Sequence, residues 1–263
     1  MNALIDLLKK GDVVAFCGAG LSCESGIPPF RGEKGLWEKY DPQQYVSQEG
    51  LNHLLKSNPL ALRTFLLEVL EVMLRAKPNP AHQLLSYLEK QGSLIGVITQ
   101  NIDDLHYQAG STNVTELHGN IYRLRCESCL DEMKLDKTQL ENVFLHLKNS
   151  HEPNRVIKVI NEFIGMCPIC QNRLKSSVVL FGQMLSQDEI EKAEEYITQG
   201  KTLLCIGTSG TVSPAVSFPY YAKEKGAKII TINPRSTVLD EIADVMINEE
   251  AGNFAERLIE ALP

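Results

Sequence analysis

The chain has 263 residues, enough for one large domain with a satellite or for two modest domains. Hydrophobic residues make up 43% and charged residues 22%, which are values typical of globular proteins. Its 33 acidic and 26 basic residues give a net charge of −7, which argues against general binding to the phosphate backbone of nucleic acids.

The first eleven residues form an amphipathic pattern and lack the apolar core and small-residue cleavage site of a signal peptide. No run of about 18 apolar residues suggests a membrane span, so a cytoplasmic location is expected. The 7 cysteines are an odd number, and four of them form two Cys-x-x-Cys pairs. This usage favours a reducing compartment and a metal site over a disulfide scaffold.

A buried strand is predicted at 13–17, where five apolar residues can cross a parallel sheet that is covered on both faces. Gly18 and Gly20 then flank Ala19, and glycines at a strand end permit close approach of a polyphosphate. The usual dinucleotide fingerprint needs a third Gly or Ala where this chain has Cys23, so an ordinary strand-to-helix turn is an alternative. The motifs of a P-loop and of a hydrolase elbow are absent.

The segment 28–45 is predicted to be an irregular ordered loop, a kind of loop that is more often functional than idle. Apolar residues then recur at helical spacing in 51–55 and 62–73, with Asn58-Pro59 between them. This apolar stripe is predicted to be core, with a ligand groove as the alternative.

Strands alternate with helices along most of the chain, which predicts an α/β fold with a doubly wound parallel sheet. Further strands are expected at 94–99, 114–117, 177–181, 202–206 and 228–232, and further helices from Pro80 to Gly92 and at 187–196, 220–225 and 253–262. Cys17 and Cys205 fall in such strands as small core residues. The segment 126–170 interrupts the alternation, so it is predicted to be an insertion into the sheet domain.

Cys126-Glu-Ser-Cys129 and Cys167-Pro-Ile-Cys170 have the spacing of two zinc knuckles. Four thiolates with no open position are typical of a structural zinc site, and a redox dithiol is the alternative. The segment between the pairs is long, but doubling a loop costs only about 0.6 kcal/mol in closure entropy. His146 and His151 lie inside it as substitute ligands, which four well-spaced cysteines make unnecessary.

Polar side chains follow two of the predicted strands. Gln100, Asn101 and Asp103 come after 94–99, and His118 comes after 114–117, at the carboxyl ends where open α/β sheets place ligands. The amide and carboxylate groups are suited to fixing a carboxamide or a ribose, or to capping the next helix. With an ordinary pKa near 6.5, His118 is a candidate general base, and a hydrogen-bonded structural histidine is the alternative.

These motifs together resemble the sirtuin family over about 13–251. The resemblance is carried by a set of segments in this order: Gly18-Ala19-Gly20-Leu21-Ser22, Glu24-Ser25-Gly26-Ile27-Pro28, Phe30-Arg31-Gly32, Thr99-Gln100-Asn101-Ile102-Asp103, Leu105-His106, Leu117-His118-Gly119-Asn120, the two cysteine pairs, Phe181-Gly182, Gly207-Thr208-Ser209 and Asn233. It implies NAD-dependent removal of acyl groups from protein lysines, with NAD+ as cosubstrate and Zn2+ as a structural ion.

The resemblance also implies roles for individual residues. His118 is the catalytic base, helped by Asn101 and Asp103, and the zinc ligands are Cys126, Cys129, Cys167 and Cys170. The implied cofactor-binding residues are Gly18, Ala19, Gly20, Ser22, Cys23, Phe30, Arg31, Gln100, Asn101, Ile102, Asp103, His118, Gly207, Thr208, Ser209, Asn233 and Ala251. A Rossmann-like NAD-binding domain is implied at 1–30, 78–118 and 178–263, a cofactor loop and helical module at 31–77, and a zinc-binding module at 119–177.

In the implied mechanism the acyl oxygen attacks the nicotinamide ribose carbon as nicotinamide leaves, and His118 then takes a proton from a ribose hydroxyl. The acyl group ends on ADP-ribose, and acylated lysines of proteins are the partners, without nucleic acid or membrane. Two alternatives remain open, namely transfer of ADP-ribose onto protein and a non-catalytic NAD-sensing zinc scaffold.

The chain departs from the family pattern at three places. Gln183 stands where a Glu is common, Cys23 replaces a small residue, and the segment between the cysteine pairs is long. In addition, the helix around 64–71 has no Tyr-x-x-Arg pair of the kind that binds dicarboxylic acyl groups in some relatives. Neutral acyl groups are therefore expected to be preferred over succinyl or malonyl groups.

Overall fold

The computed structural model describes residues 2–29 and 35–261. The chain forms two compact units. We call the first the sheet unit, built from 1–29, 77–117 and 185–263, and the second the zinc unit, built from 30–76 and 118–184. Within the described residues, no helix combines the length and the apolar character needed to cross a membrane.

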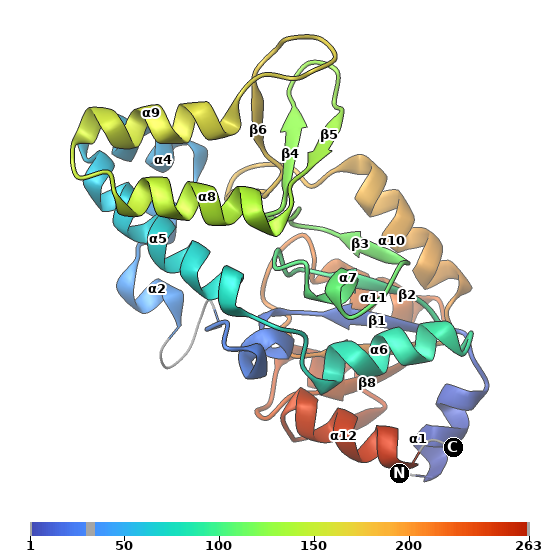
Figure 1. The fold of residues 1–263 in the computed structure, drawn as a ribbon. Helices are drawn as coiled ribbons and strands as arrows, with labels where there is room; N and C mark the ends of the chain where they lie inside the picture. The colour runs from blue at the N-terminus through green and yellow to red at the C-terminus, as the bar shows by residue number, and fades with distance from the viewer. Residues whose placement is uncertain (1, 30–34, 262–263) are drawn as a thin grey trace. The chain divides into compact units, whose positions relative to one another are not determined.

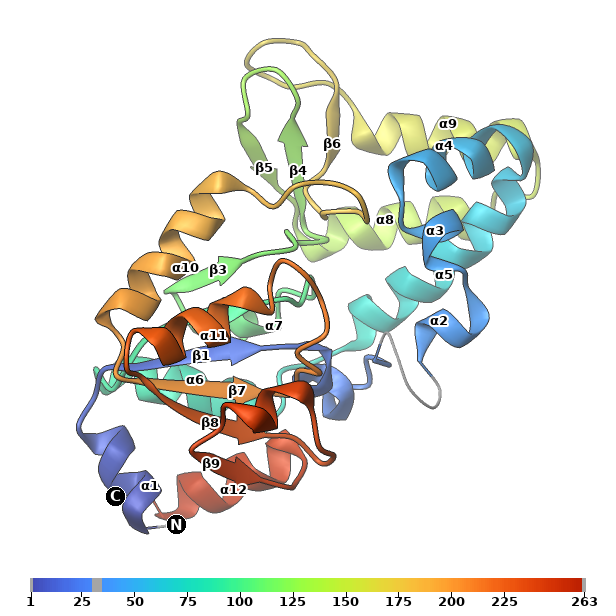
Figure 2. The same ribbon diagram turned by 180° about the vertical axis from the view of Figure 1, so that it is seen from behind.

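The sheet unit is built on a six-stranded sheet in which every neighbouring pair of strands is parallel (Figures 1 and 2). The strand order is β3-β2-β1-β7-β8-β9. The bounds are β1 Val13–Cys17, β2 Leu94–Thr99, β3 Val114–Glu116, β7 Thr202–Ile206, β8 Lys228–Ile232 and β9 Val245–Ile247. The first five strands were predicted, whereas the three-residue edge strand β9 was not.

Helices cover both faces of this sheet. Residues of β1 alternate between two cores, with Val13 and Ala15 in one and Val14 and Phe16 in the other. The first core is closed by α1 (Asn2–Lys9), α6 (Pro80–Lys90) and α12 (Ala251–Ala261), and the second by α10 (Gln187–Gln199) and α11 (Ser217–Glu224). The predicted doubly wound α/β fold is confirmed. Shorter elements are η1 (Ala19–Ser25), α7 (Leu105–Gln108) and η2 (Val238–Glu241).

Two helices begin with an asparagine cap followed by proline. Asn79 accepts hydrogen bonds from the backbone of α6, and Pro80 occupies its first turn. In the same way Asn58 caps α5 ahead of Pro59. Cys17 and Cys205 are fully buried, as expected for small core residues.

The zinc unit combines helices with a small antiparallel sheet of order β5-β4-β6. Its strands are β4 Arg123–Cys126, β5 Glu132–Lys134 and β6 Leu174–Ser176. Its helices are α2 Leu36–Lys39, α3 Pro42–Tyr45, α4 Gln48–Ser57, α5 Pro59–Arg75, α8 Lys137–Lys148 and α9 Pro153–Ile164. The segment predicted to be irregular up to Tyr45 thus contains two short helices.

The long segment between the cysteine pairs is mostly helical. Asp136 and Gln139 form a capping box that starts α8, and α9 follows after a short turn. Leu140 and Val156 of these helices share a core with Leu70 of α5. The Arg63 guanidinium of α5 also donates to the carbonyls of Leu147 and Lys148, each at 2.7 Å, at the C-terminus of α8. The insertion is therefore folded against the helical module.

The prediction of a strand at 177–181 is wrong. The regular strand β6 ends at Ser176, and it pairs with β4 instead of joining the parallel sheet. Beyond β6, Val179 donates its backbone N–H to the carbonyl of His118, and Phe181 donates its backbone N–H to the carbonyl of Val46. The backbone N–H groups of 177–181 therefore bond to two different segments of the chain. Short apolar runs of this kind carry no information about which partner they find.

Candidate functional site

The carboxyl ends of four strands are in register at one edge of the large sheet. Cys17 of β1 pairs with Thr99 of β2 and with Ile206 of β7, and Ile206 pairs with Ile232 of β8. The residues that follow these four strands therefore form a row, which is Gly18, Gln100, Gly207 and Asn233. All four belong to the predicted cofactor set, so strand register brings them together.

The glycines in this row are needed because two backbones approach closely. Gly20 donates its N–H to the Gly207 carbonyl at 2.7 Å. A Cβ atom on Gly20 would lie 2.8 Å from Gly207, and one on Gly18 would lie 2.8 Å from the Gly207 carbonyl. Gly207 itself has φ +60°. After this contact the chain turns through η1, which carries Ser22.

A buried hydrogen-bond network connects η1 to the turn after β2. The Ser22 hydroxyl donates to Asp103 at 2.7 Å, and the Asn101 side-chain amide donates to Ser22 and to the Gly18 carbonyl, both at 3.1 Å. The second carboxylate oxygen of Asp103 accepts from the Leu105 backbone at 3.0 Å. Three of the predicted residues are thus held rigidly against one another.

Burial raises the pKa of the Asp103 carboxyl, while the hydrogen bonds from Ser22 and from the Leu105 backbone act in the opposite direction. The net shift is upward. The donors at Ser22 and Leu105 therefore favour the charged form of Asp103, and the loss of Ser22 would remove one of them.

Gln100 and Thr208 connect β2 to β7. The Gln100 amide donates to the Thr208 hydroxyl at 2.9 Å, and both side chains are buried. Ser209 is exposed and contacts Thr211, Ile102 is half-buried, and Ala251 is buried at the start of α12.

Two buried side-chain amide atoms of the sheet unit have no hydrogen-bond partner among the described residues. They are the side-chain oxygen of Asn101 and the side-chain nitrogen of Asn233. Three interstrand steps separate their strands, a span of about 14 Å. One acceptor and one donor at this spacing, beside a glycine turn, fit an elongated polar ligand such as a dinucleotide.

Three further positions of the predicted cofactor set are Phe30, Arg31 and Cys23. Phe30 and Arg31 lie outside the described residues. Cys23 is half-buried and donates its thiol to the Ala19 carbonyl at 3.6 Å. Burial, and then the charges of Glu250 and Glu24, raise the pKa of this thiol, so it is neutral at physiological pH.

His118 belongs to the zinc unit and is half-buried. Its carbonyl accepts from the Val179 backbone at 2.9 Å. Next to it Gly119 has φ +73°, and a Cβ there would lie 2.0 Å from the Ser177 carbonyl, so no other residue fits. The segment 177–179 thus fixes the backbone that carries the predicted base.

Gln183, one of the departures from the family pattern, closes a turn in the zinc unit. Its side-chain oxygen accepts from the Leu180 backbone at 3.0 Å, and its amide donates to Gln48 at 3.2 Å. A carboxylate could accept the first bond but could not donate the second. The Gln183 side chain therefore uses both its oxygen and its NH2 group, which a glutamate could not do.

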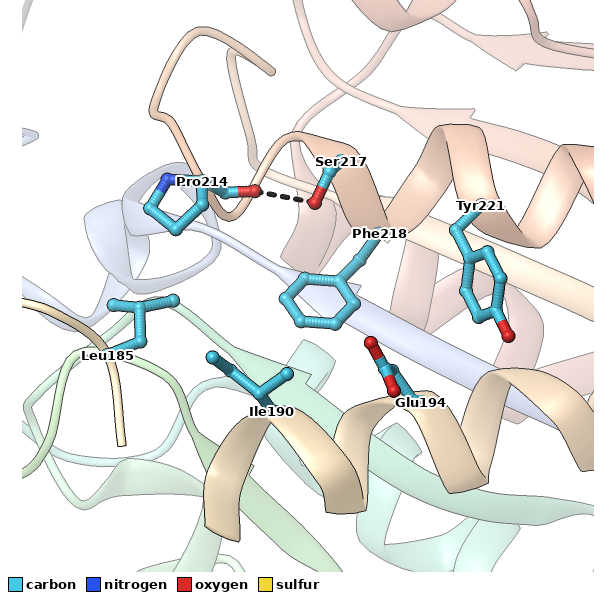
Figure 3. Close-up of a pocket in the computed structure, with 7 residues that line it drawn as sticks. All are labelled: Leu185, Ile190, Glu194, Pro214, Ser217, Phe218 and Tyr221. Atoms are coloured by element: carbon cyan, nitrogen blue, oxygen red, sulfur yellow. Dashed lines mark hydrogen bonds between the residues drawn. The ribbon is translucent and has the colours of Figure 1, made fainter. Parts of the chain in front are cut away.

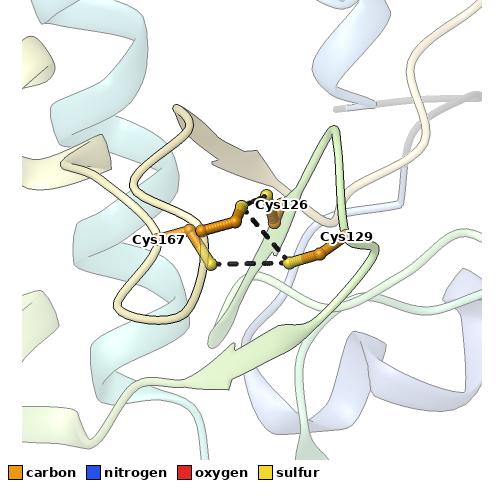
Figure 4. Close-up of side chains that lie close together, drawn as sticks. Cys126, Cys129 and Cys167 are labelled. Atoms are coloured by element: carbon orange, nitrogen blue, oxygen red, sulfur yellow. Dashed lines mark hydrogen bonds between the residues drawn. The ribbon is translucent and has the colours of Figure 1, made fainter.

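The four predicted zinc ligands come together in the zinc unit (Figure 4). Their sulfur atoms all lie within 4.8 Å of one another, with Cys126 to Cys170 at 3.4 Å and Cys129 to Cys167 at 3.6 Å. Sulfurs around a tetrahedral zinc ion, each about 2.3 Å from the metal, have a similar spacing. Within the described residues His146 and His151 are not part of the cluster.

Both cysteine pairs adopt the same backbone turn. Cys126 donates its N–H to the Asp131 carbonyl at 2.9 Å, and Cys167 donates to Asn172 at 2.7 Å. Hydrogen bonds from the Asn172 backbone and from Cys126 lower the pKa of Cys170 to about 6. A lowered thiol pKa favours the thiolate form that binds zinc.

A separate cavity of about 250 Å³ lies between α10 and α11 (Figure 3). Its walls are mostly apolar, with Phe218 at the centre and the Glu194 carboxylate at one side. None of its lining residues belongs to the predicted cofactor set, so it is distinct from the row at the strand ends.

Asn79 has a second contact that the sequence did not reveal. Besides capping α6, its amide donates to the Leu21 carbonyl of η1 at 2.7 Å. The signal for a helix cap was visible in Asn-Pro, but the contact with η1 crosses 58 positions and has no local pattern.

Comparison with known proteins identifies relatives over the full length. The profile of the Sir2 family matches residues 18–214. An NAD-dependent protein deacylase of Pyrococcus abyssi is 38% identical over 253 residues, covering 96% of this chain and 94% of that protein. The NAD-dependent protein deacylase of Thermococcus kodakarensis is 40% identical over 254 residues, covering 96% and 91%.

Solved structures agree with these sequence matches. A Sir2 homolog in complex with NAD has a TM-score of 0.78 and 32% identity, covering 100% of this chain and 93% of that chain. A Sir2 complex with a p53 peptide and NAD+ has a TM-score of 0.77 and 32% identity, covering 99% and 98%. By family profile, sequence identity and structure, the chain belongs to the Sir2 family.

Proposed function

We propose that this chain removes acyl groups from lysine side chains of proteins with NAD+ as cosubstrate, transferring the acyl group to ADP-ribose and releasing nicotinamide. The observation that carries the proposal is the buried Ser22, Asp103 and Asn101 network beside the glycine turn, in a chain of the Sir2 family. As an NAD-dependent protein deacylase it consumes its cosubstrate and does not reduce it.

The sheet unit would hold the cosubstrate along the row of strand ends. Gly18, Gly20 and Gly207 pack backbone against backbone, which holds the turn after β1 at the strand ends where the phosphates are proposed to bind. The free side-chain oxygen of Asn101 would accept from a carboxamide or a hydroxyl, and the free amide of Asn233 would donate at the adenosine end. Asp103 orients Ser22 and Asn101 and supplies negative charge near the reacting ribose. Bound NAD+ supplies the electrophilic ribose carbon.

His118 is proposed as the general base for a ribose hydroxyl. An imidazole with an ordinary pKa near 6.5 is largely neutral at physiological pH and can take a proton. Its backbone is held by Val179 and by the tight turn at Gly119, which supports a fixed orientation. Loss of a general base typically costs about a hundredfold to ten-thousandfold in rate.

The four-cysteine cluster is consistent with structural zinc, and its role is to stabilise the zinc unit. Four thiolates complete a tetrahedron, so the ion has no open position for substrate or water. Zinc would therefore add folding free energy without taking part in the chemical step.

The test is an assay with an acetyl-lysine peptide and NAD+, in which nicotinamide and deacetylated peptide are measured together. Equal amounts of both products are expected from the wild-type protein. His118→Ala should lose about a hundredfold or more in rate while its NAD+ affinity is kept. No NAD-dependent nicotinamide release from any acyl-lysine peptide would contradict the proposal. Label from adenine-labelled NAD+ that stays on protein would indicate ADP-ribosyl transfer instead.

We further propose that the partners are protein lysines and not nucleic acid, which the net charge of −7 supports. The seven unpaired cysteines support a reducing compartment such as the cytoplasm. We also propose that the chain divides into an NAD-binding domain at 1–30, 78–118 and 178–263, a helical module at 31–77 and a zinc module at 119–177.

A further inference from the structure

Glu24 connects two distant parts of the sheet unit. It lies next to the end of η1, and its carboxylate accepts a hydrogen bond of 2.6 Å from the backbone N–H of Gly252. Gly252 is the second residue of α12, 228 positions away. Backbone N–H groups in the first turn of a helix have no partner within the helix, and a carboxylate there also meets the positive end of the helix dipole.

The absence of a side chain at Gly252 leaves space for this carboxylate. A Cβ atom at this position would lie 2.6 Å and 2.7 Å from the two carboxylate oxygens of Glu24. Any side chain at 252 would therefore displace the carboxylate from the start of the helix. Glu24 is exposed, but the close fit of its carboxylate against the glycine argues against a chance contact.

The contact lies between the two regions that the proposed cofactor site requires. In η1, Gly20 contacts Gly207 and Ser22 donates to Asp103. In α12, the residue before Gly252 is the buried Ala251, one of the proposed cofactor-binding residues. Glu24 is thus bonded to the helix that carries this residue and is part of the turn that carries the proposed phosphate contacts.

We infer that Glu24 is a positioning residue of the cofactor site, which holds η1 and the start of α12 at the separation that the two ends of the dinucleotide need. The inference rests on the proposed function only in taking these two segments as cofactor contacts. Glu24 does not touch the reacting atoms, so it should affect binding of the cosubstrate and not the chemical step.

The experiment measures the Kd of ADP-ribose by calorimetry, together with KM for NAD+, KM for acetyl-lysine peptide and kcat. Glu24→Ala should raise the Kd of ADP-ribose and KM for NAD+ by about fivefold, the ratio that corresponds to about 1 kcal/mol at a helix N-terminus. Glu24→Gln keeps an acceptor oxygen and should raise them by only about twofold. The values of kcat and peptide KM should stay within about twofold of wild type.

Two further variants separate this role from general stability. Glu250→Gln removes one negative charge two positions before Gly252 without removing the bond from Gly252 to Glu24, and it should leave the Kd unchanged. Gly252→Ala removes the same contact by placing a side chain where the Glu24 carboxylate lies. The double variant Glu24→Ala with Gly252→Ala should have a Kd no higher than that of the weaker-binding single variant, because both substitutions remove the same interaction. Circular dichroism melting of each variant reports whether it is folded. If Glu24→Ala does not fold, the Kd is compared between Glu24→Gln and the wild type.

An unchanged Kd of ADP-ribose in folded Glu24→Ala and Gly252→Ala would overturn the inference, as would a fall in kcat without a change in Kd. A wild-type protein that does not bind ADP-ribose would overturn it too. By contrast, a wild-type protein that binds ADP-ribose but deacylates no peptide would contradict the proposed function, while the effect of Glu24 on the Kd would still be measured.

Discussion

The Ser22 hydroxyl donates a 2.7 Å hydrogen bond to the Asp103 carboxylate, joining two segments that are 81 positions apart in the chain. This bond opposes the effect of burial on the pKa of Asp103. A hydrogen bond to a charged group contributes about 1.5 to 3 kcal/mol, so its loss should raise the pKa of Asp103 further.

The first prediction is that Ser22→Ala moves the acid limb of the kcat/KM profile to higher pH. Asp103 is ionised above its pKa, and activity that needs the carboxylate falls as the pH drops through that pKa. The pH dependence of deacylation between pH 5 and pH 8 measures the shift. Ser25→Ala, a change in the same short helix without a contact to Asp103, is the matched control. An acid limb at the wild-type pH in Ser22→Ala would contradict this role.

The second prediction concerns stability at mildly acidic pH. Burial lowers the pKa of His106 to about 4, and neither of its ring nitrogens has a hydrogen-bond partner among the described residues. The ring of His82 lies 5.0 Å away, and burial together with His106 lowers the pKa of His82 as well. The native state therefore holds both rings neutral at a pH where the unfolded chain binds protons.

Because the native pKa of His106 lies below the unfolded value, stability is unaffected above about pH 6.5 and falls as the pH drops towards 4, by up to about 3 kcal/mol. Urea denaturation at pH 7, 6 and 5 measures this slope. His106→Phe should flatten it, whereas His146→Asn, at an exposed position of α8, should not. A slope that is the same in all three proteins would exclude His106 as its source.

The third prediction is that the purified protein contains one zinc ion per chain and that Cys167→Ala loses it. Structural zinc contributes about 10 to 16 kcal/mol in small domains, so chelation should unfold the zinc unit and reduce activity indirectly. Metal content is measured by elemental analysis, with Cys23→Ala as the control that keeps its metal. Zinc retained at wild-type content in Cys167→Ala would refute the assignment of this ligand.

The fourth prediction is that Leu130→Gly stabilises the zinc unit. Leu130 follows the first cysteine pair with φ +62° and is 58% exposed, so its side chain strains the backbone without adding a core contact. The left-handed conformation costs a residue with a side chain about 1 to 2 kcal/mol, of which the greater freedom of unfolded glycine cancels a part. Leu130→Gly is expected to release zinc to a chelator more slowly than the wild-type protein. Ile169→Gly, at an exposed position of the other knuckle without positive φ, should speed release instead.

The fifth prediction is that acetyl-lysine is preferred over succinyl-lysine in the same peptide by at least about a hundredfold. The helix α5 presents Glu68 and Glu71 and no Tyr-x-x-Arg pair, and Glu68 forms an ion pair with Lys39. A buried succinyl carboxylate without a cationic partner costs several kcal/mol. Comparable kcat/KM on the two peptides would show that another cation receives the carboxylate.

Local patterns in the sequence were sufficient for most elements of the sheet unit and for the metal ligands. The strands β1, β2, β7 and β8 are near-continuous apolar runs of the kind that a sheet buried on both faces requires. The caps at Asn58 and Asn79 are short-range hydrogen bonds within one turn of a helix. The spacing of each cysteine pair is likewise a property of a few consecutive residues, which is why the cluster was predictable.

Only the tertiary structure decided which partners distant segments find. The register of four strands places Gly18, Gln100, Gly207 and Asn233 in one row, and the bond from Gly252 to Glu24 crosses 228 positions. The run at 177–181 gives its backbone donors to His118 and Val46 instead of to a parallel strand. Such contacts depend on the packing of the whole unit and leave no periodic trace in the chain. Sequence therefore determined which residues carry the chemistry, whereas packing determined which of them touch and which are deprived of water.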